Sequence, residues 1–384
     1  MKKLRVGVIY GGRSGEHEVS VASAASIIRH LNRERYEPIA IRIEKDGRWT
    51  LPDKAPTAIS AADVLEQGRL AASRPGRPAR TALLVAHPGE ESVLSIERHA
   101  GGDDSGATVT GLGLDVIFPV LHGPYGEDGT VQGLLELAGL PYVGVGVLGS
   151  AVGMDKAVMK TMFAAHKLPL VKHVVVMARE WATDRSGVLA RVEKALGFPS
   201  FVKPANLGSS VGISKAKTAD ELAAGIDLAV QFDRKIVIEA GVVDAREIEC
   251  AVLGNDEPVA SIPGEIVPSR EFYDYEAKYL DNSSELLIPA PLTEKQVAEV
   301  QRLAIAAFRA VDGAGLSRVD FLMDRKRGKL YLNEVNTLPG FTTISMYPKL
   351  WEASGLPYAE LLDRLIALAI ERHAEKQQLR TSLT

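Results

Sequence analysis

Short apolar runs alternate with helical patterns along most of the chain, and this alternation limits the possible folds more than any other feature. A strand-like run at 4–10 ends at a glycine pair and is followed by apolar residues at helical spacing. Residues 37–43 and 114–121 form the next two apolar runs, and a helical pattern covers 130–139. Because strands that alternate with helices usually pair in parallel, we predict a parallel α/β sheet up to about residue 147.

Two further α/β units follow. In the second unit, strand patterns flank a Gly/Ser-rich loop at 207–212, which favours a hairpin over a strand-to-helix nucleotide turn. In the third unit, the last two strand patterns lie at residues 317–324 and 329–336. Residues 52–112 are rich in Ala, Gly, Pro and Arg, and we interpret them as an elaborated surface of the first domain. The expected domains are residues 1–147, 148–240 and 241–384.

Charge and cysteine content restrict the function classes. The 384-residue chain has a formal net charge of −4, which gives no reason to expect nucleic-acid binding. Cys250 is the single cysteine, so no intrachain disulfide can form, and we expect a reducing, cytoplasmic location. Cys250 lies in the apolar run 248–253, so we interpret it as a small buried hydrophobe rather than a nucleophile. No apolar run approaches the ~20 residues of a membrane span.

A pair of predicted strands carries the strongest chemical signal. Arg318 and Asp320 are two residues apart on the first strand, and Glu334 and Asn336 are two apart on the second, so each pair shares a face. Such carboxylate and amide oxygens suit Mg²⁺. We predict two ions that share Glu334, with Asp320 and Asn336 completing the ligands. The alternative interpretation is a solvent-facing polar face on an edge hairpin.

The segment from Lys203 to Gly212 indicates phosphate binding. Its glycines allow the backbone to approach an anion closely, while Ser209 and Ser210 add hydroxyl donors and Lys203 adds a charge. The lysine precedes the glycines, so this is not the P-loop pattern. A plain flexible hairpin is the alternative. Lys156, at the start of a predicted helix, is an ordinary solvated residue unless it lies beside these groups.

Seven segments together resemble the ATP-grasp superfamily and, within it, the D-alanine–D-alanine ligase family. They run in the family's order along nearly the whole chain, whereas the block 52–110 matches poorly. The matching segments are GGRSGEHEVS (11–20), HGPYGEDGTVQG (122–133), MDK (154–156), KPANLGSSVG (203–212), EFYDYEAKY (271–279), RVDF (318–321) and NEVNTLPGFT (333–342).

The resemblance implies a three-domain ATP-grasp ligase architecture with ATP held between the central and C-terminal domains. It implies that two D-alanine molecules are joined through an acyl phosphate to D-alanyl-D-alanine, for peptidoglycan precursor synthesis. The implied cofactors are ATP and two Mg²⁺ ions, which Mn²⁺ can replace. A homodimer is the assembly that the resemblance leads us to expect.

The resemblance also implies roles for individual residues. The implied ATP-binding residues are Lys156, Lys203, Ser210, Glu239, Ala240 and Glu247. The implied substrate-binding residues are His122, Lys278, Ser345 and Met346. The implied catalytic residues are Glu16, Ser209, Tyr279, Arg318 and Gly340. Ala240 departs from the family pattern, which often has lysine there, so only backbone contacts to adenine remain at this position.

Three other functions compete with this interpretation. An ATP-grasp ligase with a different acid or amine would share these motifs, and ADP release with D-alanine alone would separate the two. A non-catalytic nucleotide-binding regulator would keep the Gly/Ser loop but would not need Arg318 beside three metal ligands. A nicotinamide dehydrogenase is disfavoured because no GxGxxG follows the first strand.

Overall fold

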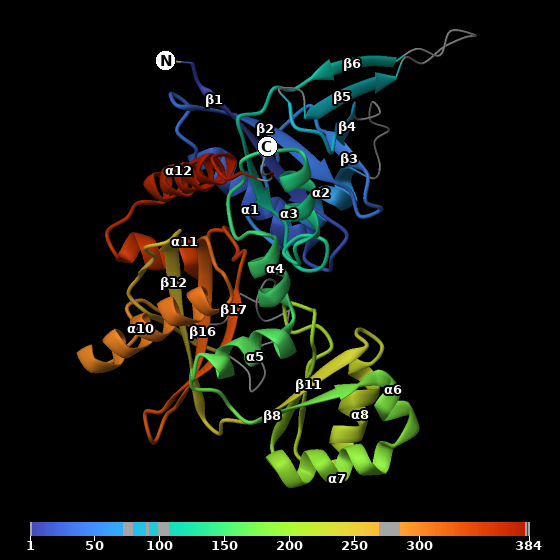
Figure 1. Cartoon of the computed structure of the whole chain (residues 1–384), viewed down its shortest axis with the longest axis vertical. Helices are drawn as coiled ribbons and strands as arrows, with labels where there is room; N and C mark the ends of the chain where they lie inside the picture. Colours follow the sequence, from blue (N-terminus) through green and yellow to red (C-terminus); the bar gives the residue numbers. More distant parts are fainter. Residues whose placement is uncertain are drawn as a thin grey trace.

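Over the residues that it describes, the computed structural model of the chain contains three β-sheets with helices packed against them (Figure 1). It describes residues 2–71, 80–89, 92–98, 107–268, 285–380 and 382. The α/β class predicted from the sequence is confirmed. Over these residues, no helix combines the length and the apolar composition that a membrane span requires.

The first sheet lies in the N-terminal part of the chain. Its strands are β1 (Leu4–Gly11), β2 (Tyr36–Ile43), β3 (Trp49–Leu51), β4 (Arg80–Leu84), β5 (Val93–Arg98), β6 (Ala107–Gly111) and β7 (Val116–Val120). Its helices are α1 (His17–His30), α2 (Ala61–Ala71) and α3 (Thr130–Leu137). The order is β6-β5-β4-β3-β2-β1-β7. As predicted, β1 pairs in parallel with β2 and β7. The sheet is mixed, because β3 to β6 extend it with antiparallel pairs.

The second sheet forms the central part of the chain. Its strands are β8 (His173–Met177), β9 (Ser200–Pro204), β10 (Ser214–Ala216) and β11 (Lys235–Ala240), in the order β10-β9-β11-β8. The helices of this region are α4 (Val147–Met154), α5 (Lys156–Ala165), α6 (Ala178–Thr183), α7 (Arg185–Leu196) and α8 (Ala219–Ala229). β9 and β10 are antiparallel neighbours, so the Gly/Ser-rich loop is the hairpin that the sequence predicted.

The third sheet is antiparallel. Its strands are β12 (Ala245–Gly254), β13 (Val259–Ala260), β14 (Gly264–Val267), β15 (Glu285–Leu287), β16 (Gly315–Asp324) and β17 (Leu330–Asn336). Its helices are α10 (Glu294–Ala310), α11 (Met346–Ala353) and α12 (Tyr358–Gln377). The strands follow the order β15-β14-β12-β16-β17, with β13 beside β12. Thr293 and Gln296 form a capping box that fixes the start of α10.

A β-bulge sets the geometry of β17. Asp320 pairs with Glu334, but Phe321 pairs with Leu332, so Asn333 is an extra residue in the ladder. Without this extra residue, Leu332 would share a face with Glu334. The bulge instead turns Leu332 into the core beside Val335, and both are buried.

Two helices connect the sheets. α12 packs on the first sheet, since its leucines at 361, 362 and 365 share one buried cluster with Val6 and Phe118. α5 lies against the third sheet, because Met159 and Phe163 share a cluster with Phe321. These contacts hold the N-terminal loops and the start of α5 against the edge of the third sheet.

Candidate active site

A cavity of about 400 Å³ lies where loops of all three sheets meet. Most of the predicted site residues line it. They are Glu16, His122, Lys156, Ser209, Arg318, Glu334, Asn336, Gly340, Ser345 and Met346. Two predicted residues, Lys278 and Tyr279, lie outside the described residues.

Two adjacent parallel strands deliver acidic and imidazole groups to the cavity. Glu16 follows the carboxyl end of β1, and His122 follows the carboxyl end of β7, which pairs with β1. Loops at the carboxyl ends of parallel strands are the usual location of ligand sites. Glu16 is mostly buried, with 8% of its surface exposed.

The Gly/Ser hairpin reaches across to the N-terminal loop. The Ser209 hydroxyl donates a hydrogen bond to the Glu16 carboxylate. Ser209 and Ser210 have φ of 48° and 60°, so two successive serines adopt the left-handed conformation. Such strained residues cluster at ligand-binding loops, where the surrounding structure maintains them. The predicted Glu16–Ser209 contact is therefore present, while the third member of the predicted trio, Tyr279, lies outside the described residues.

His122 presents one ring nitrogen to the cavity. Its Nδ1 lies 3.0 Å from the carbonyl oxygen of Leu338, which can only accept, so Nδ1 carries the proton. Burial lowers the pKa of His122 below its usual value, which favours the neutral ring. Its Nε2 is buried and has no hydrogen-bond partner among the described residues. A neutral His122 thus offers the ligand a hydrogen-bond acceptor.

Glu127 is a cavity residue that the sequence analysis missed. Its carboxylate accepts a hydrogen bond from the Gly123 amide at 3.1 Å. Burial, reinforced by the charge of Glu16, raises its pKa to about 8. The raised pKa favours the protonated carboxyl group at neutral pH. The signal was an acidic residue within the glycine-rich loop after a parallel strand.

Arg318 is held by two carboxylates. Its guanidinium binds both oxygens of Asp320, at 2.7 and 2.6 Å, and contacts Glu249 at 3.0 Å. Glu249 lines the cavity and is the second residue that the sequence analysis missed, because it sits in an apolar run. The neighbouring Cys250 is buried, and burial raises its pKa to about 12, so its interpretation as an inert core residue holds.

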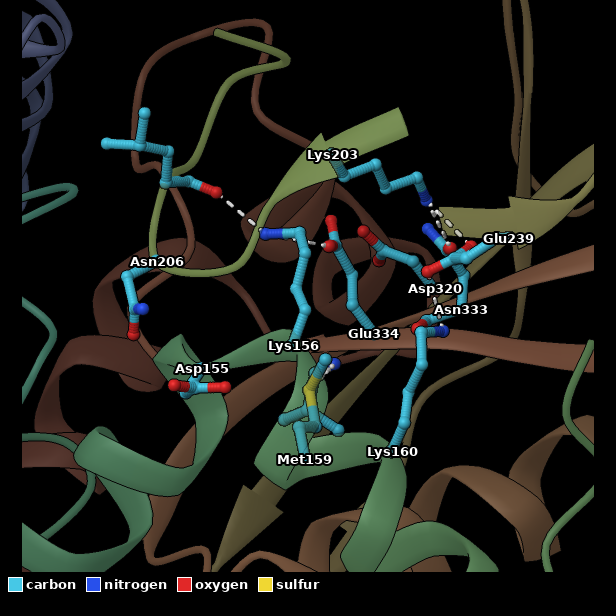
Figure 2. A network of polar contacts seen from close by, with 12 residues as sticks. Asp155, Lys156, Met159, Lys160, Lys203, Asn206, Glu239, Asp320, Asn333 and Glu334 are labelled. Atoms are coloured by element: carbon cyan, nitrogen blue, oxygen red, sulfur yellow. Dashed lines mark hydrogen bonds and ion pairs between the residues drawn. The ribbon is translucent and has the colours of Figure 1, made fainter. Parts of the chain in front are cut away.

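The first turn of α5 places Lys156. Asp155 caps the helix by accepting hydrogen bonds from the amides of Ala157 and Val158, both at 3.1 Å. Asp155 also binds Lys235 at 2.6 Å. The Lys156 ammonium then donates to the Leu207 carbonyl at 2.7 Å and lies 3.6 Å from Glu334 (Figure 2).

Lys203 and Glu239 lie in a buried ionic network beside the cavity rather than in its lining. Lys203 contacts Glu239 at 2.9 Å and Asn333 at 3.3 Å (Figure 2). A second lysine, Lys160, contacts Glu239 from the other side at 3.0 Å. Lys160 is the third residue that the sequence analysis missed, because it looks like any lysine on a helix.

The loop after β17 crowds Gly340 against Ser345. A Cβ at Gly340 would lie 2.8 Å from the Ser345 hydroxyl, so only glycine fits without a shift. That hydroxyl is fixed by the amide and hydroxyl of Thr342, at 2.9 and 2.8 Å. The remaining predicted residues are also absent from the cavity lining; they are Asp320 on β16, Ala240 on β11, Glu247 on β12 and Ser210.

The acidic strand pair fits Mg²⁺ by its chemistry. Asp320 and Glu334 are direct partners in the β16–β17 ladder, so their carboxylates share a face with Asn336. Across the described ranges, no group of three or more His, Cys, Asp or Glu side chains is arranged to hold a metal. Two carboxylates and an amide oxygen nonetheless suit Mg²⁺, which is usually held by one or two carboxylates together with phosphates and waters.

An antiparallel sheet with acidic strands, facing a Gly/Ser hairpin of a second sheet, is the arrangement of the ATP-grasp ligases, and the fold places the chain in this class. Family models described as the N-terminus and the C-terminus of D-ala D-ala ligase match residues 5–145 and 162–367. The D-alanine–D-alanine ligase of Heliobacterium modesticaldum is 52% identical over 379 residues, which cover 98% of each chain. The chain belongs to the D-alanine–D-alanine ligase family.

Solved structures agree with this assignment. The D-alanine–D-alanine ligase of Coxiella burnetii has a TM-score of 0.80 and 37% identity, with 98% of this chain and 97% of that chain covered. The VanG D-Ala:D-Ser ligase of Enterococcus faecalis has a TM-score of 0.79 and 32% identity, with 96% and 100% covered. The fold is therefore shared by ligases that are named for different second substrates.

Proposed function

We propose that the chain's family reaction, the ATP-dependent joining of two D-alanines into a peptidoglycan precursor, takes place in the cavity through an acyl phosphate. The observation that supports this proposal is the meeting of Glu16, Ser209, Arg318 and Gly340, from three different sheets, around one space. This arrangement brings together a carboxylate, a loop suited to phosphate binding, and donors for an oxyanion. Such an arrangement suits a reaction between two bound substrates.

In the first step, a carboxylate oxygen of one D-alanine attacks the γ-phosphorus of ATP. The bond from that phosphorus to the β-phosphate oxygen breaks, and ADP leaves with the bonding electrons. Lys156, Lys203 and Ser210 are the proposed phosphate contacts. Glu239, Ala240 and Glu247 are the proposed adenosine contacts, and Glu16 is the proposed partner of the substrate ammonium.

Mg²⁺ would be held by Asp320, Glu334 and Asn336, with two ions sharing Glu334 and Mn²⁺ as a possible replacement. When bound, the ions would neutralise the polyphosphate charge. Asp320 and Glu334 are each held by a cation in this structure, Arg318 and Lys156 respectively. The face is thus already built for positive charge.

In the second step, the amine of the other D-alanine, after losing a proton, attacks the acyl carbon. A carbon–nitrogen bond forms, the carbon–oxygen bond to phosphate breaks, and inorganic phosphate leaves. Arg318 and the Gly340 amide would stabilise the oxyanion as preorganised donors. The second D-alanine would be held by Ser345, Met346 and Lys278, and the first D-alanine by His122. Tyr279 would complete a hydrogen-bonded trio with Glu16 and Ser209.

The remaining expectations about the whole molecule belong to this proposal. We place the domains at residues 1–147, 148–240 and 241–384, with one sheet in each. The need for ATP supports a cytoplasmic location. The homodimer follows from the family resemblance alone.

Isotope exchange tests the acyl phosphate. ATP labelled with ¹⁸O in the β,γ-bridge should scramble the label into non-bridging β-phosphate positions when only the first D-alanine site reacts. Mass spectrometry of the full reaction should find D-alanyl-D-alanine. Dipeptide formation without any scrambling under conditions that slow ADP release would refute the two-step route. D-serine should be assayed in parallel, because the similar structure from Enterococcus faecalis is that of a D-Ala:D-Ser ligase.

A further inference from the structure

Lys160 is a charged side chain with 0% of its surface exposed. It lies on α5, one turn after Lys156. Its ammonium contacts Glu239 on β11 at 3.0 Å and donates to the backbone carbonyl of Asn333 on β17 at 3.1 Å. A buried charge is costly even when paired, and an apolar side chain of similar volume is often as stable. Stability alone therefore gives little reason for a lysine at this position.

The contacts of Lys160 close a ring of four residues (Figure 2). Glu239 accepts from Lys203 with its other carboxylate oxygen at 2.9 Å. Asn333 binds Lys203 through its side-chain oxygen at 3.3 Å and Lys160 through its carbonyl. Burial opposes ionisation of Glu239, but the two lysines outweigh it and lower its pKa to about 2.

The bulge in β17 makes this ring possible. Because the β16–β17 ladder skips Asn333, its carbonyl is turned from the ladder toward α5. The amide of Val335 in the same strand also donates to the Met159 sulfur, on α5, at 3.3 Å. Lys160 thus links the helix that begins at Lys156 to the strand segment that carries Glu334.

We propose that Lys160 is a positioning residue for ATP, which keeps Glu239 neutralised and in place so that Lys203 can turn from Glu239 to a phosphate oxygen. This inference rests on the proposed assignment of Lys203 and Glu239 to ATP. When Lys203 engages a phosphate, Glu239 loses one of its two cations. Without Lys160, that movement would leave the buried Glu239 carboxylate unpaired, and the free-energy cost would weaken nucleotide binding.

Nucleotide titration tests the proposal. Lys160→Met should weaken binding of the β,γ-methylene analogue of ATP about tenfold, equivalent to ~1.4 kcal/mol. The KM for ATP should rise with it, whereas the KM for D-alanine should stay within about twofold, because Lys160 contacts Glu239 and Asn333, neither of which lines the cavity. An unchanged affinity of the folded variant for the analogue would overturn the proposal.

A double-mutant cycle separates positioning from general support of the fold. Once Glu239→Gln removes the carboxylate charge, Lys160 has nothing to neutralise. Adding Lys160→Met to Glu239→Gln should then cause no further loss of affinity, although Lys160→Met alone does. Equal losses in both backgrounds would show that Lys160 acts by packing or through Asn333, and would refute the proposed route through Glu239.

Two controls complete the design. Leu222→Ala removes a fully buried side chain of α8 that packs on Val202 and Ile238, on the face of the second sheet opposite Lys203 and Glu239. It should destabilise the protein without changing nucleotide affinity. Lys203→Met tests the underlying ATP assignment. If Lys203→Met leaves affinity unchanged, the assignment itself fails. If Lys203→Met weakens binding and Lys160→Met does not, only the role of Lys160 fails.

Discussion

Replacing Asp155 should loosen the helix that carries Lys156 and Lys160. Asp155 caps α5 through two amide hydrogen bonds and binds Lys235 at 2.6 Å in a mostly buried pair. Loss of a cap costs about 1 kcal/mol. Loss of a hydrogen bond to a charged group costs about 1.5–3 kcal/mol more. We therefore expect Asp155→Ala to destabilise α5 by roughly 3 kcal/mol, the sum of these two effects.

Amide hydrogen exchange measures this effect locally. Exchange in α5 should become about a hundredfold faster in Asp155→Ala, at ~1.4 kcal/mol per decade. Asp184 offers a matched control, because it caps α7 through the Gly187 amide at 2.9 Å and is exposed. Asp184→Ala should speed exchange in α7 only about fivefold, the value of a cap alone. Asp155→Asn keeps a hydrogen-bond acceptor but loses the charge, so it should speed exchange in α5 less than Asp155→Ala does.

The same substitution should affect function and pH dependence. The KM for ATP should rise, since Lys156 is the first residue of α5. Burial alone would raise the pKa of Asp155, but the hydrogen bonds from Lys235 and the helix amides lower it overall. Its contribution is therefore complete above the ordinary value of 3.8 and is lost as pH falls through the lowered value. The reasoning fails if exchange in α5 responds no more than exchange in α7.

Three further predictions concern the cavity. Glu334→Gln should nearly abolish ADP release while leaving thermal unfolding unchanged, because a ligand shared by two ions is lost; near-normal turnover at saturating Mg²⁺ would contradict the metal assignment. Glu127 binds its proton more tightly when folded, so the stability of the wild-type protein should fall from pH 4.5 to about 8 relative to that of Glu127→Gln; melting temperatures of the two proteins that change in parallel across this range would contradict the raised pKa. Tyr279→Phe should raise the share of D-alanyl-D-lactate when D-alanine and D-lactate compete. The hydroxy acid satisfies the Tyr279 hydroxyl less well than the amine does, and a hydroxyl left unpaired in a closed site costs about 1–3 kcal/mol. An unchanged product ratio would leave Tyr279 a packing residue.

The sequence by itself determined the local elements and much of the chemistry. The two-residue spacing predicted that Arg318 and Asp320 share a face of their strand, and the burial of Val319 and Phe321 on the opposite face agrees with this. Thr293 and Gln296, three residues apart in the sequence, form the local capping signal at which α10 starts. The hairpin at 207–212 also formed as expected. These features depend on residues a few positions apart, whose periodicity and hydrogen-bonding chemistry are visible in one dimension.

Only the tertiary structure decided which groups meet. Lys160 looks like an ordinary helix residue until the bulge at Asn333 and the carboxylate of Glu239 surround it. Glu127 shifts its pKa because burial and Glu16 act together on it. The antiparallel strands β4, β5 and β6 were hidden by weak periodicity, and the packing of α12 on the first sheet joins segments more than two hundred residues apart. Burial and charge pairing depend on such long-range contacts, which no local pattern encodes.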